Sequence, residues 1–141
     1  MLVTSCLLSD ATSAVATAMR FTESGTPNST ANYDEVFVDL KVNTTFQDIG
    51  HQNYNEFRFG AVLNGNNRDS GIHYIYNANN SSEYTFITCE GVRYGGSTSL
   101  FGRQGGGVFT SASAVDGIQV GILTDGTKNL TAGKMALYKV V

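Results

Sequence analysis

The feature that most constrains the fold is a succession of short runs in which apolar and polar residues alternate, separated by segments rich in Gly, Asn, Ser and Thr. A period of two places successive side chains on opposite faces, as in a β-strand. The clearest run is Glu35–Asn43, where Val36, Val38, Leu40 and Val42 share one face. Runs of this kind predict an all-β protein.

Other strand-like runs follow at short intervals. They are Leu2–Leu8, Glu56–Leu63, Ile72–Tyr76, Glu83–Tyr94, Gly117–Leu123 and Lys134–Val141. With no internal repeat, eight to nine strands predict an antiparallel two-sheet sandwich, jelly-roll-like in layout. We expect residues 1–141 to form this single domain, with 1–8 as either an interface arm or the first strand.

The segment Ala14–Thr22 fits two structures. Asp10 before an Ala-rich stretch is a possible helix cap. However, Val15, Thr17 and Met19 alternate with small or polar residues, a pattern that favours a half-buried strand.

Several intervening segments lack this alternation and are interpreted as loops. They are Glu23–Tyr33, Phe46–Tyr54, Asn64–Gly71, Asn77–Ser82 and Gly95–Gly107. Gly102–Gly107 is glycine-rich enough to suggest a phosphate cradle, but a P-loop needs Lys-Ser/Thr and then a helix. This stretch is therefore expected to be a flexible loop or bulge, or else an interaction loop.

The charge of the chain disfavours two classes of partner. The net charge is −3, and the nine Lys and Arg residues are spread along the sequence. Binding to nucleic acid or to an anionic membrane surface normally needs a basic cluster, so neither is expected. No apolar run is long enough for a membrane span, and Met1–Leu8 lacks the basic start of a signal peptide.

Few residues suggest chemistry. Cys6 and Cys89 are read as two buried free thiols, with one disulfide as the alternative, and His51 and His73 as structural or surface residues. No spacing matches a metal site or a catalytic triad. We therefore expect no enzymatic activity, no catalytic residue, no cofactor and no metal.

Pairs of carboxylates remain as candidates for glycoside hydrolysis. The pairs are Glu35 with Asp39, Asp48 with Glu56, and Glu83 with Glu90. Charges on solvated strand faces explain all of them more simply.

Four segments carry a resemblance to a family of proteins. Tyr33–Val42, Phe57–Asn66, Thr110–Val120 and Leu130–Val140 resemble strands of small tailed-bacteriophage virion proteins, the last two as a closing hairpin. Lys139 departs from the Gly that such proteins often carry there. That family includes capsid decoration (cement) proteins and tail-associated domains. A chain this short, starting at its own Met and without a coiled coil, favours the decoration class.

The resemblance implies partners and a location. The expected partners are the major capsid protein and further copies of the chain, as a dimer or trimer, on the capsid surface of a virion made in the host cytoplasm. Candidate interface residues are Leu2, Val3, Leu7 and Leu8 in an arm, and Leu100, Phe101 and Arg103 in a loop. The alternative is a tail-fibre or receptor-binding module for carbohydrate, in which Tyr54, Tyr74, Tyr76 and Tyr94 would stack on sugars.

Overall fold

The computed structural model describes residues 1–13, 15–62, 68–95 and 99–140. These residues form eleven strands and no helix, which confirms the all-β prediction. The strands are β1 (Leu2–Ser9), β2 (Val15–Glu23), β3 (Thr26–Pro27), β4 (Tyr33–Lys41), β5 (Phe46–Tyr54), β6 (Phe57–Val62), β7 (Arg68–Tyr76), β8 (Thr85–Gly95), β9 (Ser99–Phe109), β10 (Gly117–Gly121) and β11 (Leu130–Leu137).

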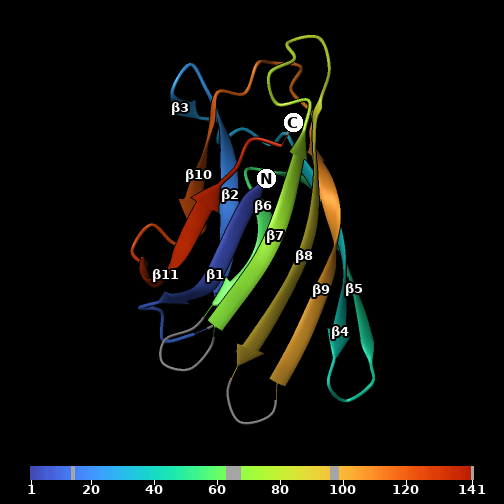
Figure 1. Ribbon diagram of the computed structural model, residues 1–141, viewed down its shortest axis with the longest axis vertical. Helices are drawn as coiled ribbons and strands as arrows, with labels where there is room; N and C mark the ends of the chain where they lie inside the picture. Colours follow the sequence, from blue (N-terminus) through green and yellow to red (C-terminus); the bar gives the residue numbers. More distant parts are fainter. Residues whose placement is uncertain (14, 63–67, 96–98, 141) are drawn as a thin grey trace.

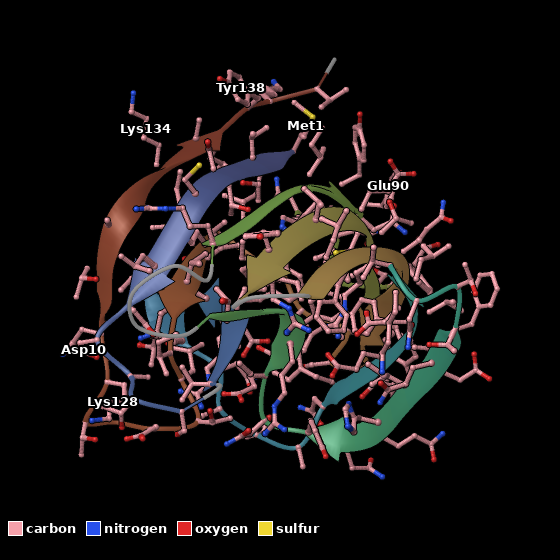
Figure 2. The ribbon with its side chains drawn as sticks, turned by 90° about the horizontal axis from the view of Figure 1, so that it is seen from below. Met1, Asp10, Glu90, Lys128, Lys134 and Tyr138 are labelled. Atoms are coloured by element: carbon pink, nitrogen blue, oxygen red, sulfur yellow. The ribbon has the colours of Figure 1, made fainter. Side chains whose placement is uncertain are left out.

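The strands form two antiparallel sheets. The large sheet has seven strands in the order β11-β1-β7-β8-β9-β4-β5. In the small sheet, β2 pairs with β10 on one edge and with β3 and β6 on the other. The large sheet curves around the small one (Figure 2), and β2 and β6 lie behind it in Figure 1. The predicted two-sheet sandwich is confirmed.

The ambiguous segment after Asp10 is a strand, as the alternation favoured. Asp10 caps no helix; its carboxylate accepts a hydrogen bond of 2.9 Å from the Asn129 N–H, and its own N–H donates to the Asn129 carbonyl. A register shift between Thr17 and Ala18 interrupts the pairing of β2 with β6. Residues on both sides of this bulge are therefore buried in succession.

Three strands were not predicted: β3, β5 and β9. Phe46–Tyr54 was expected to be a loop, but it forms the border strand of the large sheet, and its polar residues suit that exposed position. Gly95–Gly107 was also expected to be irregular, yet β9 lies between β8 and β4. A Cβ on Gly107 would lie 2.6 Å from the Phe57 ring, so this glycine lets an aromatic ring pack directly on the backbone.

The two final strands do not form the expected hairpin. β10 pairs with β2 in the small sheet, whereas β11 pairs with β1 at the border of the large sheet. The last strand also starts and ends earlier than Lys134–Val141, and Val141 lies outside the described residues. The connector between them therefore crosses from one sheet to the other.

The core lies between the sheets and is rich in aromatic rings. Tyr33 and Phe109 of the large sheet meet Phe21 of the small sheet, with ring centroids 4.8 to 6.1 Å apart. The Tyr33 hydroxyl accepts from the Phe21 N–H and donates to the Asn28 carbonyl, and burial raises the pKa of Tyr33 to about 12. A second pair, Phe37 and Phe57, packs edge to face.

Candidate functional site

The surface that stands out is the side of the large sheet that faces away from the small sheet. We call it the outer face. Strand register places its side chains in rows; one row runs from Val3 through Ile72, Glu90 and Gln104 to Val38. Its large apolar residues are Val36, Val38, Leu40, Ile72, Tyr74, Tyr76, Phe86, Val92, Tyr94 and Leu100.

Every one of those apolar residues is well exposed. Their exposed fractions range from 37% for Val38 to 64% for Val36. Monomeric proteins seldom leave a contiguous apolar area of more than a few hundred Å² in water, and larger ones mark interaction sites. The outer face is therefore the candidate functional site.

Polar side chains share the outer face, since strand register places Arg68 beside Tyr94 and Asp48 beside Val38. Glu90 sits near its centre, where its carboxylate accepts a 3.3 Å hydrogen bond from the Gln104 amide. The Tyr76 hydroxyl lies 3.4 Å from the Thr88 hydroxyl. A surface of aliphatic and aromatic side chains interspersed with polar groups suits contact with another protein.

The opposite side of the large sheet, the inner face, carries buried charge. Arg103 donates to both oxygens of Asp39, at 2.7 and 2.9 Å, and to the Arg58 carbonyl in the small sheet. Bidentate pairing of this kind is among the stronger ion-pair geometries. Arg103 thus links the sheets from within.

A second buried carboxylate also joins the sheets. One oxygen of Glu35 lies 2.7 Å from His51 Nδ1, and the other accepts from the Arg58 N–H at 2.6 Å. Burial raises the pKa of Glu35 above its usual range. Beside this pair is a cavity of about 200 Å³ that Arg58 and Arg103 also line.

The expected solvated carboxylates are therefore buried in three cases. Glu35 and Asp39 lie on the inner face, and Glu56 is fully buried with its two oxygens bound by Arg20 and Arg58. Each of these acids has a partner donor that holds it in place. Their role in the fold is to connect elements.

His73 is a buried histidine on the inner face. It is 1% exposed, its ring lies 4.4 Å from the Phe59 ring, and neither ring nitrogen has a hydrogen-bond partner. Burial lowers the pKa of His73 to about 4, so the ring is neutral at pH 7. This places His73 among the structural histidines, as predicted.

The residues predicted for an interface arm form a paired strand instead. β1 lies between β11 and β7, so of the two alternatives the first strand is the one observed. Leu2 and Leu7 are 2% and 1% exposed in the core, which removes them as surface residues. Val3 and Leu8 are half-buried.

The residues predicted for an interface loop lie on β9 and point to different sides. Leu100 is 43% exposed on the outer face, as an interface residue would be. Phe101 faces the other way, with the Arg93 guanidinium 4.2 Å from its ring centre. Arg103 is engaged by Asp39, so it is not available at the surface.

A groove of about 720 Å³ lies where β7, β10 and the segment after β11 meet. Tyr74, Tyr76 and Tyr138 line it together with apolar residues and the polar Asn79, Asp116 and Lys139. Of the other tyrosines predicted for sugar stacking, Tyr54 packs between His51 and Arg58, and Tyr94 lies outside the groove.

The cysteines are unpaired, as the simpler interpretation predicted. Cys89 is buried in the core, and burial raises the pKa of its thiol to about 12. Cys6 is exposed rather than buried, because the bulge in β1 turns it outward with a φ of 53°.

Two further features were searched for in the described ranges. No three His, Cys, Asp or Glu side chains there come together in a way that would hold a metal ion. None of those ranges contains a helix capable of crossing a bilayer.

Comparison with known proteins finds no matching family, no similar curated protein and no similar solved structure. The candidate site therefore rests on its own geometry.

The sequence analysis grouped the residues of the outer face correctly but did not predict that this face is exposed. Alternation correctly divides Val36, Val38 and Leu40 from Glu35, Phe37 and Asp39, but it does not show which set is buried. The valine face is outside, and the face with two carboxylates is inside.

Proposed function

We propose that this protein is a non-enzymatic structural protein of a phage virion, which binds the assembled capsid and stabilises it. The observation that supports this function is the exposed apolar outer face of the large sheet. The resemblance of four segments to small virion proteins supplies the class of particle.

The size of the outer face fits a protein interface. Its width, from β1 to β5, is five strand spacings of about 4.8 Å each. Its length, from Phe86 to Tyr94, is eight residues of about 3.4 Å each. The area is therefore roughly 600 Å². A standard protein interface buries about 800 Å² on each partner. Binding only the assembled shell stabilises that shell by mass action.

The test is binding of the purified protein to expanded capsids, with shell resistance to heat as the readout. Replacing Val36 and Val92 by Glu puts two charges on the outer face and should abolish binding. The control places Glu at Ala31 and Gly126, which are exposed loop positions, the second with no atom near its missing Cβ. If the wild type binds no shell, or if both double variants bind alike, the proposal fails.

One observation favours a second function, recognition of carbohydrate. The groove of about 720 Å³ presents Tyr74, Tyr76 and Tyr138, and tyrosine rings can stack on sugar rings. A glycan array distinguishes the two functions. Binding that Tyr76→Ala removes and Tyr94→Ala, outside the groove, leaves intact would support the carbohydrate module, whereas a blank array favours the capsid protein.

A further inference from the structure

The two border strands of the large sheet differ in how well their free edges are protected. A free strand edge offers unpaired N–H and C=O groups to another chain, and proteins usually block it with bulges, Lys or Pro. β11 is blocked: its pairing with β1 shifts register twice, Gly133 has a φ of 118°, and Lys134 is exposed.

β5 has none of these devices over its central part. It contains no Lys or Pro, and its pairing with β4 is regular from Phe46 to His51. Among the described residues, no strand pairs with its other edge, and no element lies beyond it in Figure 1 or Figure 2. Regularity ends at Asn53, where φ is 57°.

We propose that β5 pairs with β5 of a second copy of this chain, antiparallel about a two-fold axis at Gly50. A two-fold axis makes an interface self-complementary, so residues equally far before and after the axis lie opposite each other. The ladder then covers Asp48–Gln52. It places Gly50 opposite its own copy, Ile49 opposite His51, and Asp48 opposite Gln52.

Charge complementarity favours this register. Asp48 and Gln52 are both exposed, and each Asp48 carboxylate faces an amide donor. The two carboxylates themselves stand four residues apart along the strand, roughly 13 Å. An axis at Asp48 would instead put the two carboxylates directly opposite, which is unfavourable.

The pairing would join two large sheets edge to edge and place two outer faces side by side. It therefore adds a second copy as partner along the free edge of β5, at the border of the capsid-binding face, and it does not depend on the proposed function. The ladder is short, so it predicts a weak dimer in solution.

Cross-linking tests the register. In an antiparallel pair, opposite Cα atoms lie about 4.5 to 5.5 Å apart, within the range a disulfide spans. Gly50→Cys should thus form a disulfide-linked dimer on mild oxidation, and its new Cβ meets only the Glu35 carbonyl, at 4.0 Å. Asp48→Cys is the matched control and should not cross-link. Both are made with Cys6→Ser, since Cys6 is exposed.

Charge exchange tests the same pairing without a cross-link. Gln52→Asp puts two pairs of carboxylates face to face and should weaken the dimer roughly tenfold in sedimentation equilibrium. Adding Asp48→Lys to that variant restores opposite charges and should recover dimerisation. Both positions are exposed, so neither change should unfold the protein.

Several results would overturn the proposal. These are a wild-type chain that stays monomeric at every concentration, equal cross-linking of the two cysteine variants, or a dimer indifferent to Gln52→Asp. Capsid binding gives an independent readout: it should follow Val36 and Val92 and remain in the Gln52→Asp variant.

Discussion

The two faces of the large sheet reverse the usual placement of charged and aliphatic residues. The inner face buries Glu35, Asp39 and His73, while the outer face exposes Val36 and Tyr94 to solvent. Buried charges are tolerated because partners on the small sheet or on the same face hold them, as Arg58 and Arg103 do. The comparison teaches that burial here does not follow hydrophobicity alone: the buried carboxylates have donors that hold them, whereas His73 is buried as a neutral ring without a hydrogen-bond partner.

The largest effect on the free energy of unfolding is expected from replacing Arg103 on the inner face. Arg103→Met would leave the Asp39 carboxylate buried at 4% exposure without its bidentate partner. Losing one member of a buried pair costs about 3 to 5 kcal/mol of unfolding free energy. Urea unfolding of the two proteins measures this loss.

The matched variant removes the charge of Asp39 together with that of Arg103. Asp39→Asn combined with Arg103→Met removes both charges of this pair, so most of the lost stability should return. Equal stability of the single and double variants would show that Asp39 does not depend on Arg103.

The second prediction concerns pH and His73. The pKa of His73 is lowered by burial from 6.5 to about 4, so between these values the unfolded chain binds more protons than the folded one. The free energy of unfolding therefore falls as pH falls through this window, by about 3 kcal/mol in total.

His73→Leu should remove that part of the pH dependence. Glu35 contributes with opposite sign, because its pKa is raised and its folded form gains as pH falls. It is present in both proteins, so the difference between their stability–pH curves isolates His73. Parallel curves from pH 7 to 4 would contradict the assignment.

The third prediction compares two glycines of the large sheet. Gly107→Ala forces a Cβ to 2.6 Å from the Phe57 ring and 2.3 Å from the Asp34 carbonyl, and should cost about 1 to 3 kcal/mol. Gly50→Ala meets only one atom at 4.0 Å and should be nearly neutral. Thermal unfolding of both shows whether the inner face is as tightly packed as the distances indicate.

The smallest effect on stability is expected on the outer face. Val36→Thr keeps a β-branched side chain at a position 64% exposed and should change the unfolding free energy by less than about 0.5 kcal/mol. A loss comparable with that of Arg103→Met would mean that the outer face is part of the core. Calorimetry on the two variants side by side decides this.

The fold class was predictable because strand periodicity is a local property of the sequence. The alternating runs around Val36, Phe57 and Ile87 predicted these strands and the division of their side chains between two faces. β5 and β9 were missed because a border strand is polar and a strand beneath aromatic rings is glycine-rich, and both compositions also occur in loops. Propensity alone does not distinguish these cases.

The candidate site was less predictable than the fold. Which face is buried depends on partners far away in sequence, such as Arg103 for Asp39, a separation of 64 residues. Leu2 and Leu7 were interpreted as surface residues, but pairing on both sides places them in the core. Leu100, expected in an interface loop, is exposed on strand β9, and its place in an interface stays a prediction.

The position of β1 has a consequence for how the chain folds. Leu2 pairs with His73 on one side and with Leu137 on the other. Both partner strands of β1 are therefore synthesised much later than β1 itself. Contacts of such long range slow folding, to milliseconds or seconds in all-β domains. During synthesis the apolar β1 stays unpaired until β7 has left the ribosome. We expect fragments that end before β7 to aggregate or to engage chaperones.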